Sequence, residues 1–282
     1  MTMNLVLQGP GVEQSQLAQI GALAQAARSQ ILGAHALRCE DVLDTPEVRE
    51  QVAAAAFAAQ VDATFIEAGR SLADFALVAM DMDSTLITIE CIDEIADMQG
   101  LKAQVSEITE AAMRGELDFA ASLTRRVALL EGLEASALAR VYEERLRISM
   151  GGEAMLAAVQ AAGLKTLLVS GGFTFFTERL QQRLSLDYAH ANVLEVEDGR
   201  LTGRVVGGIV DAEEKRRTVE RVCVELGIPT SRAIVMGDGA NDLRMMGIAG
   251  LSVAFRAKPV VRAQAGVALN FSGLDGILNV LA

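Results

Sequence analysis

The sequence contains no tryptophan, only two histidines and only three cysteines among its 282 residues. The cysteines, Cys39, Cys91 and Cys223, stand far apart and lack the close spacing of zinc ligands or of a redox pair. Scattered thiols of this kind are typical of a reducing compartment, so we expect a cytoplasmic protein. The isolated histidines, His35 and His190, give little support to catalysis by a histidine nucleophile.

Basic clusters and long apolar runs are missing as well. Acidic residues number 37 against 25 basic ones, and the resulting net charge of −12 repels nucleic acid. No apolar stretch approaches the roughly 18 to 20 residues of a membrane-spanning helix, and the first residues lack the basic start and apolar core of a secretion signal. We therefore expect neither nucleic acid nor membrane as a partner. With 51% hydrophobic residues, the chain can form one large domain or two smaller ones.

The most informative feature that is present is the pair Asp81 and Asp83. It follows the apolar run at 75–80, which is typical of a parallel strand covered on both faces. Open α/β sheets bind ligands at the carboxyl ends of their strands. A carboxylate nucleophile beside a second carboxyl that carries a proton is the equipment for phosphoryl transfer through an aspartyl phosphate. A polar strand end, or a helix N-cap at Ser84, is the structural alternative.

Three later segments place further polar groups in a fixed order. Ser170 follows a second run expected to be buried, at 164–169, and precedes two glycines, so its hydroxyl and the next amides suit an anion at a helix start. Lys215 follows Asp211-Ala-Glu-Glu, a pattern that resembles a capping box. After a third apolar strand, a Gly-Asp-Gly-Ala-Asn-Asp turn contains Asp238, Asn241 and Asp242. A cap, a solvated helix charge and a turn could each explain one segment, but their joint order favours a catalytic site.

This order and spacing resemble those of the haloacid dehalogenase-like phosphatases over about residues 75–275. The segments at 90–96, 113–119 and 122–127, together with Ser170-Gly171-Gly172-Phe173, resemble more closely the phosphoserine phosphatases of the bacterial serine-biosynthetic type. The resemblance implies a Mg²⁺-dependent enzyme that hydrolyses O-phospho-L-serine to L-serine and phosphate through an aspartyl-phosphate intermediate. That reaction is the last step of serine biosynthesis.

The resemblance also implies roles for single residues. Asp81 would be the nucleophile, and Asp83 the general acid and base. The substrate would be bound by Glu90, Met113, Phe119, Arg126, Ser170, Gly171, Lys215 and Asn241. The metal ligands would be Asp81, Asp83, Asp238 and, through a water molecule, Asp242. By residue type alone, Glu90 and Arg126 are ordinary surface charges, so their contacts with the substrate ammonium and carboxylate come from the resemblance.

The expected fold class is α/β, with a Rossmann-like parallel sheet covered by helices on both faces in residues 71–282. Apolar periodicity predicts four helices inserted after the Asp81 strand, at 92–98, 102–113, 119–131 and 134–147. We expect them to form a cap at about 88–150. Strands and helices then alternate, which indicates parallel, right-handed connections. The Asp198-Gly199 turn predicts a hairpin over 193–206.

Residues 1–70 are expected to form a small separate α/β domain. Their pattern predicts strands at 5–7, 31–37 and 63–66 and helices at 17–27 and 48–59. This order faintly resembles the amino-acid-sensing ACT fold, although no ligand motif is present. A regulatory role with an amino-acid effector, a homodimer contact and a purely structural role all remain open.

Two other functions are compatible with the sequence. One is a phosphatase or phosphotransferase that acts on another small phosphomonoester, and the other is a non-catalytic amino-acid sensor. The complete set of Asp81, Asp83, Lys215 and Asp238 argues against the sensor. One departure from the resembled family is Met150-Gly151-Gly152, where relatives often have a proline near the return from the cap. The hinge geometry there is therefore not predicted.

Overall fold

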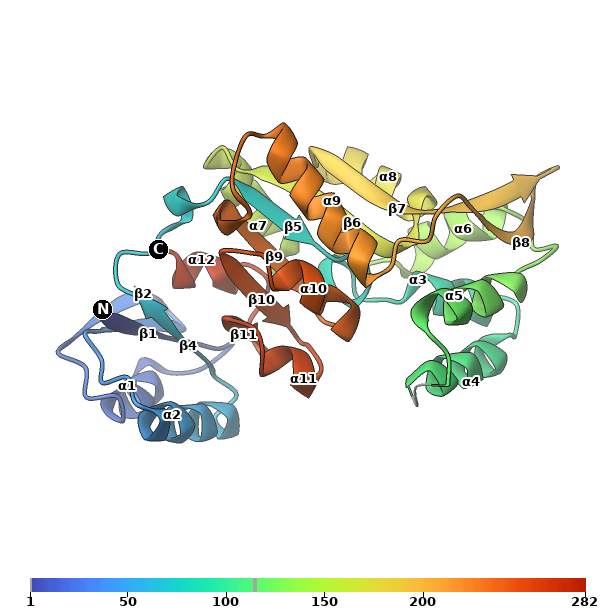
Figure 1. Cartoon of the computed structure of the whole chain (residues 1–282). Helices are drawn as coiled ribbons and strands as arrows, with labels where there is room; N and C mark the ends of the chain where they lie inside the picture. Colours follow the sequence, from blue (N-terminus) through green and yellow to red (C-terminus); the bar gives the residue numbers. More distant parts are fainter. Residues whose placement is uncertain (1, 114–115) are drawn as a thin grey trace.

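The computed structural model describes residues 2–113 and 116–282 (Figure 1). The strands are β1 (Met3–Gln8), β2 (Arg28–Gly33), β3 (Ala36–Glu40), β4 (Asp62–Glu67), β5 (Leu77–Met80), β6 (Lys165–Phe173), β7 (Tyr188–Glu197), β8 (Arg200–Val206), β9 (Ala233–Gly237), β10 (Leu251–Phe255) and β11 (Val267–Leu269). The helices are α1 (Gln14–Ala22), α2 (Pro46–Ala58), α3 (Cys91–Asp97), α4 (Lys102–Met113), α5 (Phe119–Ala128), α6 (Ser136–Arg140), α7 (Gly152–Ala161), α8 (Thr174–Leu184), α9 (Ala212–Glu225), α10 (Leu243–Met246), α11 (Pro259–Arg262) and α12 (Gly276–Val280).

The strands form a small antiparallel sheet and a large, mostly parallel one. The small sheet has the order β2-β3-β1-β4, and the large one the order β11-β10-β9-β5-β6-β7-β8. Only β7 and β8 pair antiparallel within the large sheet, as the predicted hairpin. From β5 the chain adds β6 to β8 on one side and β9 to β11 on the other, so the strand order reverses beside β5. Crevices for ligands form at such switch points. The predicted α/β class, with a small N-terminal sheet, is confirmed.

The central strand β5 is apolar throughout because helices cover both of its faces. Val78 and Met80 belong to the hydrophobic core that includes α7, α8 and α12. Leu77 and Ala79 point to the opposite face and join the core formed with α9, α10 and α11. Since side chains alternate along a strand, an apolar residue is required at every position of β5.

The helices α3 to α6 form the cap at the right of Figure 1. It is anchored to the large sheet, because Val105, Leu123 and Val127 belong to the same core as β5, and α5 contacts β8. The helix predicted at 134–147 is present but shorter by two residues at each end, since α6 covers Ser136–Arg140 and a π-helical turn, Val141–Arg145, continues it. The chain must become extended there, because Ile148 pairs with Ile87 in a bridge at the base of the cap.

Two predicted elements near strand ends also differ. The single strand expected at 31–37 is two strands, β2 and β3, joined by a tight turn with Gly33 opposite Ala36. Apart from a half-buried Leu32, the residues of β2 are exposed. The sequence of β2 therefore lacks the apolar alternation that would predict its pairing with β3. The helix expected to open at Ser170 instead begins at Thr174, because β6 continues through Phe173.

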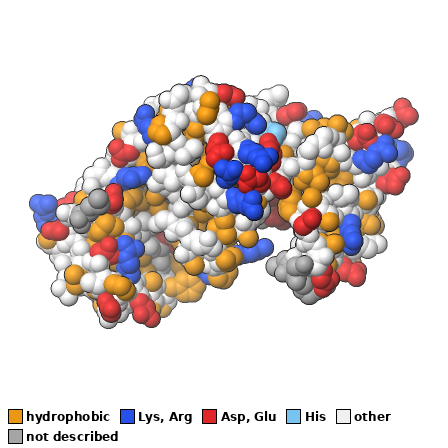
Figure 2. All heavy atoms as spheres, viewed as in Figure 1, with side chains coloured by type: hydrophobic (Ala, Val, Ile, Leu, Met, Phe, Trp, Pro, Cys, Tyr) orange, Lys and Arg blue, Asp and Glu red, His pale blue; other side chains and the backbone are white. Residues whose placement is uncertain are grey.

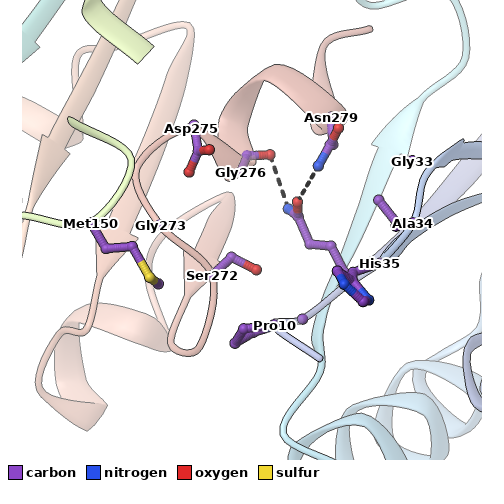
Figure 3. A pocket seen from close by; sticks show the side chains of 13 residues that line it. Pro10, Gly33, Ala34, His35, Met150, Ser272, Gly273, Asp275, Gly276 and Asn279 are labelled. Carbon is purple, nitrogen blue, oxygen red and sulfur yellow. Dashed lines mark hydrogen bonds between the residues drawn. The ribbon is translucent and has the colours of Figure 1, made fainter. Parts of the chain in front are cut away.

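The small sheet packs on both of its faces. Leu5, Leu7 and Leu17 belong to a separate core with α1 and α2, whereas Val6 and Ile66 belong to the main core. Gln8 contacts the C-terminal segment: its amide donates to the Gly276 carbonyl at 2.9 Å and accepts from Asn279 at 2.8 Å. Figure 3 shows Gly276 and Asn279 at the ends of these two dashed lines. A cavity of about 300 Å³ lies between the two parts. The proposed boundary at residue 70 is therefore crossed by polar and apolar contacts.

Candidate active site

Asp81 and Asp83 lie on a tight turn at the carboxyl end of β5. The Asp81 amide donates to the Met236 carbonyl of β9 at 3.0 Å, which extends the sheet by one residue. The chain then turns through Ser84, whose φ of 56° reverses its direction. Leu86 closes this turn by donating to the Asp81 carbonyl at 3.3 Å. The Asp81 carboxylate, 5% exposed, thereby sits at the strand end rather than in solvent.

Lys215 places one ammonium group between two buried carboxylates. It is 1% exposed and donates to Asp81 Oδ1 at 2.7 Å and to Asp242 Oδ1 at 2.8 Å. Burial alone would lower the pKa of Lys215, but Asp242 and Asp81 raise it, so the lysine is charged. Burial, followed by repulsion from Asp242, holds the pKa of Asp81 well above its usual range, although Lys215 opposes this. Two carboxylates share one cation, and the site has an excess of negative charge.

A small, hard cation would balance this excess of negative charge. Oxygens of Asp81, Asp238 and Asp242 lie within 4.8 Å of one another. Asp242 is held rigidly, since its Oδ2 accepts the backbone N–H groups of Asp238 and Gly239 at 3.2 and 3.1 Å. Burial and then Asp242 raise the pKa of Asp238 to about 6. A cluster of carboxylate oxygens is the donor set that Mg²⁺ prefers, so these residues fit the predicted metal.

Ser170 and Gly171 lie in the last part of β6, beside the aspartates. Ser170 Oγ accepts the Gly172 N–H at 2.8 Å, and the buried Asn192 donates to the Gly171 carbonyl at 2.7 Å. A Cβ at Gly172 would stand 2.8 Å from Asp83 Oδ2, because the turn that holds Asp83 lies close against β6. The strand end thus holds a hydroxyl and small residues next to both carboxylates.

The cap closes over this edge of the sheet. Phe119, the first residue of α5, packs so close to Gly171 that a Cβ there would stand 2.7 Å from its ring. Glu90 precedes α3 and accepts the Ser84 hydroxyl at 2.7 Å. Arg126 of α5 is largely buried, which lowers its pKa, while the nearby carboxylates of Asp93 and Glu90 raise it. In the space-filling view the surface is hollowed between cap and core (Figure 2).

Asp83 lies between the sheet edge and the cap. Its Oδ1 accepts the Cys91 N–H at 3.3 Å. Burial, with a further contribution from Glu90, raises the pKa of Asp83 to about 7. Of Asp81 and Asp83, Asp83 is thus the one whose carboxyl accepts a hydrogen bond from the cap helix α3.

Nearly all predicted site residues line one cavity of about 280 Å³ between cap and sheet. They are Asp81, Asp83, Glu90, Phe119, Arg126, Ser170, Gly171, Lys215, Asp238 and Asn241. Asp242 lies behind the cavity, against Lys215. Met113 ends α4, and its side chain lies outside the described residues. The individual roles of these residues stay predictions.

Two charged lining residues, Asp93 and Lys258, were not predicted as site residues from the sequence. Asp93 stands three positions after Glu90 on α3, a spacing that puts both on one helix face and could have indicated it. Lys258 follows β10, and its backbone N–H donates to the Asp238 carbonyl at 3.1 Å. No local signal marks Lys258, because its position depends on β10 lying beside β9.

Comparisons with known proteins agree on one family. The model of the haloacid dehalogenase-like hydrolases matches residues 78–247, and a domain of unknown function, DUF4072, matches residues 5–52. A phosphoserine phosphatase of Polaromonas sp. is 57% identical over 215 residues, which cover 74% of this chain and 91% of that protein. The phosphoserine phosphatase of Haemophilus influenzae is 47% identical, with 79% and 71% covered.

Solved structures extend the likeness to the N-terminal region. A haloacid dehalogenase family hydrolase of Salmonella enterica serovar Typhi has a TM-score of 0.89 at 32% identity, with 100% of this chain and 99% of that chain covered. A probable phosphoserine phosphatase of Vibrio cholerae has a TM-score of 0.83 at 36% identity, with 99% and 86% covered.

The fold, the carboxylate pair at the end of β5 and these matches define a hydrolase class. The chain belongs to the haloacid dehalogenase-like hydrolase family. Within that family its similarity groups it with the phosphoserine phosphatases. Among the described residues, no helix is both long enough and apolar enough to cross a bilayer.

Proposed function

We propose that this protein hydrolyses O-phospho-L-serine to L-serine and inorganic phosphate, with Mg²⁺ as cofactor, as the last step of serine biosynthesis in the cytoplasm. The observation that carries the proposal is the single cavity that joins Asp81 and Lys215 of the core to Arg126 of the cap. The core residues suit a phosphoryl group, and the cap residues suit an amino acid. Curated relatives named phosphoserine phosphatase support the same substrate.

The first half of the proposed reaction transfers the phosphoryl group to the protein. A carboxylate oxygen of Asp81 attacks phosphorus, and the bond from phosphorus to the serine oxygen breaks. Asp83 donates its proton to that departing oxygen, so that L-serine leaves as the alcohol. Lys215, Ser170 and Asn241 are proposed to hold the phosphoryl oxygens. When bound, Mg²⁺ supplies positive charge that reduces repulsion between the Asp81 carboxylate and the phosphate.

The second half regenerates the enzyme. Asp83, now ionised, takes a proton from a water molecule whose oxygen attacks phosphorus. The bond from phosphorus to Asp81 breaks, and inorganic phosphate leaves. Phe119 covers Gly171 at this edge and is proposed to exclude bulk water until the substrate is bound.

The function is tested by phosphate release from O-phospho-L-serine and from a panel of other phosphomonoesters, with Mg²⁺ and with a chelator. The proposal expects the highest kcat/KM for phosphoserine and loss of turnover on chelation. A clear preference for another phosphomonoester would assign a related phosphatase instead. No turnover of any panel member would favour the non-catalytic amino-acid sensor.

For residues 1–70 we propose a small N-terminal α/β domain that packs against and supports the phosphatase part at 71–282, with its cap at about 88–150. An amino-acid effector or a homodimer contact at this domain is proposed as its further role. Calorimetric titration of the full chain with L-serine, at concentrations above those that fill the active site, tests the effector. Light scattering after size-exclusion chromatography gives the mass that tests the homodimer.

A further inference from the structure

Asp93 presents an unused acceptor to the active-site cavity. It lies on α3, on the cavity wall, three residues after Glu90. Its Oδ1 is buried and accepts no hydrogen bond from any residue that the structure describes. An unpaired buried acceptor is costly, since it has lost water without gaining a donor. Such an atom at a binding cavity indicates a donor that arrives with the ligand.

Arg126 faces the same cavity and has a matching unused donor. Its Nε is buried and finds no acceptor among the described residues. Asp93 is the carboxylate that most strongly raises the pKa of Arg126, ahead of Glu90. Yet no hydrogen bond or ion pair within the described chain joins Asp93 to Arg126. The two groups are near each other and oppositely charged, but both remain available to a third group.

An α-amino acid carries the two groups that this wall lacks. Its carboxylate can accept from Arg126, and its ammonium has three N–H donors to place. Glu90 cannot satisfy all three, because the three N–H bonds of an ammonium group point in different directions and one carboxylate lies on only one side; its Oε1 also accepts the Ser84 hydroxyl at 2.7 Å. Burial raises the pKa of both Glu90 and Asp93, so a cation beside them would offset an existing cost.

We propose that Asp93 is a specificity-determining residue that accepts a hydrogen bond from the ammonium group of the substrate, beside Glu90. This inference rests on the proposed function and adds a residue, Asp93, that makes the site select substrates with an ammonium group. It explains why a cavity already rich in carboxylates has another on the cap side. Phosphomonoesters that carry a carboxylate but no ammonium are discriminated against, because they leave Asp93 buried and unpaired.

The test compares Asp93→Asn with the wild type on two substrates. O-phospho-L-serine and 3-phosphooxypropanoate differ only in the ammonium group, so general damage cancels in their ratio. For Asp93→Asn we expect kcat/KM on phosphoserine to fall about 10-fold to 100-fold, mainly through KM, since one charge-assisted hydrogen bond is lost. On 3-phosphooxypropanoate we expect a change of at most about twofold. Asp93→Ser is a second variant with the same expected pattern.

Asp97→Asn is the matched control. It removes the same charge from the same helix, but Asp97 pairs with Arg145 outside the cavity. We expect it to leave the substrate ratio unchanged. Equal losses on both substrates by well-folded Asp93 variants, as judged by thermal melts, would mean that Asp93 acts through Arg126 and would overturn the inference. An unchanged ratio would overturn it too. Failure of the wild type to hydrolyse phosphoserine would instead refute the proposed function.

Discussion

At the scale of single residues, the centre of the site contains two buried carboxylates but only one lysine to pair with them. Lys215 donates to both Asp81 and Asp242, which are almost fully buried. The shared lysine fixes the two carboxylates in place, and Asp81 Oδ1 also accepts the Met82 N–H at 2.8 Å. Oδ2 of Asp81 accepts no hydrogen bond that the described residues provide. Asp81, the proposed nucleophile, is thus oriented by one oxygen and free at the other, which is the arrangement that attack on phosphorus requires.

Asp81→Asn should therefore abolish turnover, because an amide cannot attack phosphorus to form the aspartyl phosphate. We expect less than about a thousandth of wild-type kcat with the fold retained, since the amide is nearly isosteric with the carboxylate. Asp83→Asn should still form some aspartyl phosphate but release it slowly. Acid-quench trapping of phosphoenzyme, with circular dichroism as the fold control, separates the two. Turnover by Asp81→Asn above that level, without deamidation, would contradict the covalent mechanism.

Arg126→Ala tests recognition of the substrate carboxylate. Losing a charge-assisted, bidentate contact in a desolvated pocket should reduce kcat/KM for phosphoserine roughly 30-fold to 1000-fold. The effect on p-nitrophenyl phosphate, which has no carboxylate, should be far smaller. Steady-state kinetics on both substrates give the comparison. Equal losses would remove Arg126 from recognition and weaken the assignment of phosphoserine.

His190 predicts a pH dependence of stability that is separate from catalysis. Burial lowers the pKa of His190, Arg221 adds to this, and Glu214 opposes it. The unfolded chain, with an ordinary histidine pKa of about 6.5, then binds the proton more tightly than the folded one. The stability contributed by the neutral His190 is therefore present above the unfolded pKa of about 6.5. It is lost as the pH falls through the lower pKa of the folded state. In urea denaturation from pH 8 to 5, the wild type should lose stability relative to His190→Gln. The opposite trend would mean that the interaction with Glu214 raises the pKa of His190 by more than burial lowers it.

The sequence predicts the core of the site better than its cap side. Asp81, Ser170 and Asp238 each follow an apolar strand, so parallel topology alone brings them to one edge. Asp93 lies on a helix of the cap, and Lys258 stands three residues beyond the end of β10 rather than directly after it. Their place depends on how the cap docks and on which strand neighbours β9, and neither is encoded in a local pattern.

At the scale of elements, long periodic segments were predictable, whereas their ends were predictable only where local signals set them. The helix expected at 102–113 has those bounds in α4, and Asp211 caps α9 through the N–H groups of Glu213 and Glu214 as expected. The misplaced helix start at Ser170 has a tertiary cause, since Asn192 of β7 holds the Gly171 carbonyl and keeps the chain extended. Side-chain contacts from a distant strand leave no trace in a local window.

The return from the cap depends on Gly151, which the sequence left without a predicted geometry. Its φ is 75°, and a Cβ there would stand 1.9 Å from Asp275 Oδ1. Gly163 has a similar φ of 82° but open space around it. Gly163→Ala should cost about 1 kcal/mol of unfolding free energy from backbone strain, and Gly151→Ala at least about twice that, since the clash adds to the strain. Urea denaturation measures both, and equal costs would show that the hinge yields without penalty.

At the scale of the whole molecule, the small sheet is joined to the C-terminal segment more closely than a tethered domain would be. Asp62 of β4 is 1% exposed, and its carboxylate accepts the backbone N–H groups of Asn270 at 2.7 Å and Ser272 at 2.8 Å. The same segment leads to Leu274, whose N–H donates to the Met150 carbonyl at the cap return. A continuous set of contacts therefore runs from the N-terminal sheet to the hinge, and the two parts are expected to unfold together.

Asp62→Ala tests this coupling. The substitution leaves buried backbone donors unpaired, so we expect it to cost about 3 kcal/mol of unfolding free energy. Glu67→Ala, an exposed carboxylate on the same strand, is the control and should change stability by less than about 0.5 kcal/mol. Hydrogen exchange should show residues 270–282 opening first in Asp62→Ala, because the segment has lost its anchor on β4. If Asp62→Ala costs no more than Glu67→Ala, or if exchange in that segment is unchanged, the small sheet is an independent domain that does not reach the cap hinge through Asp62.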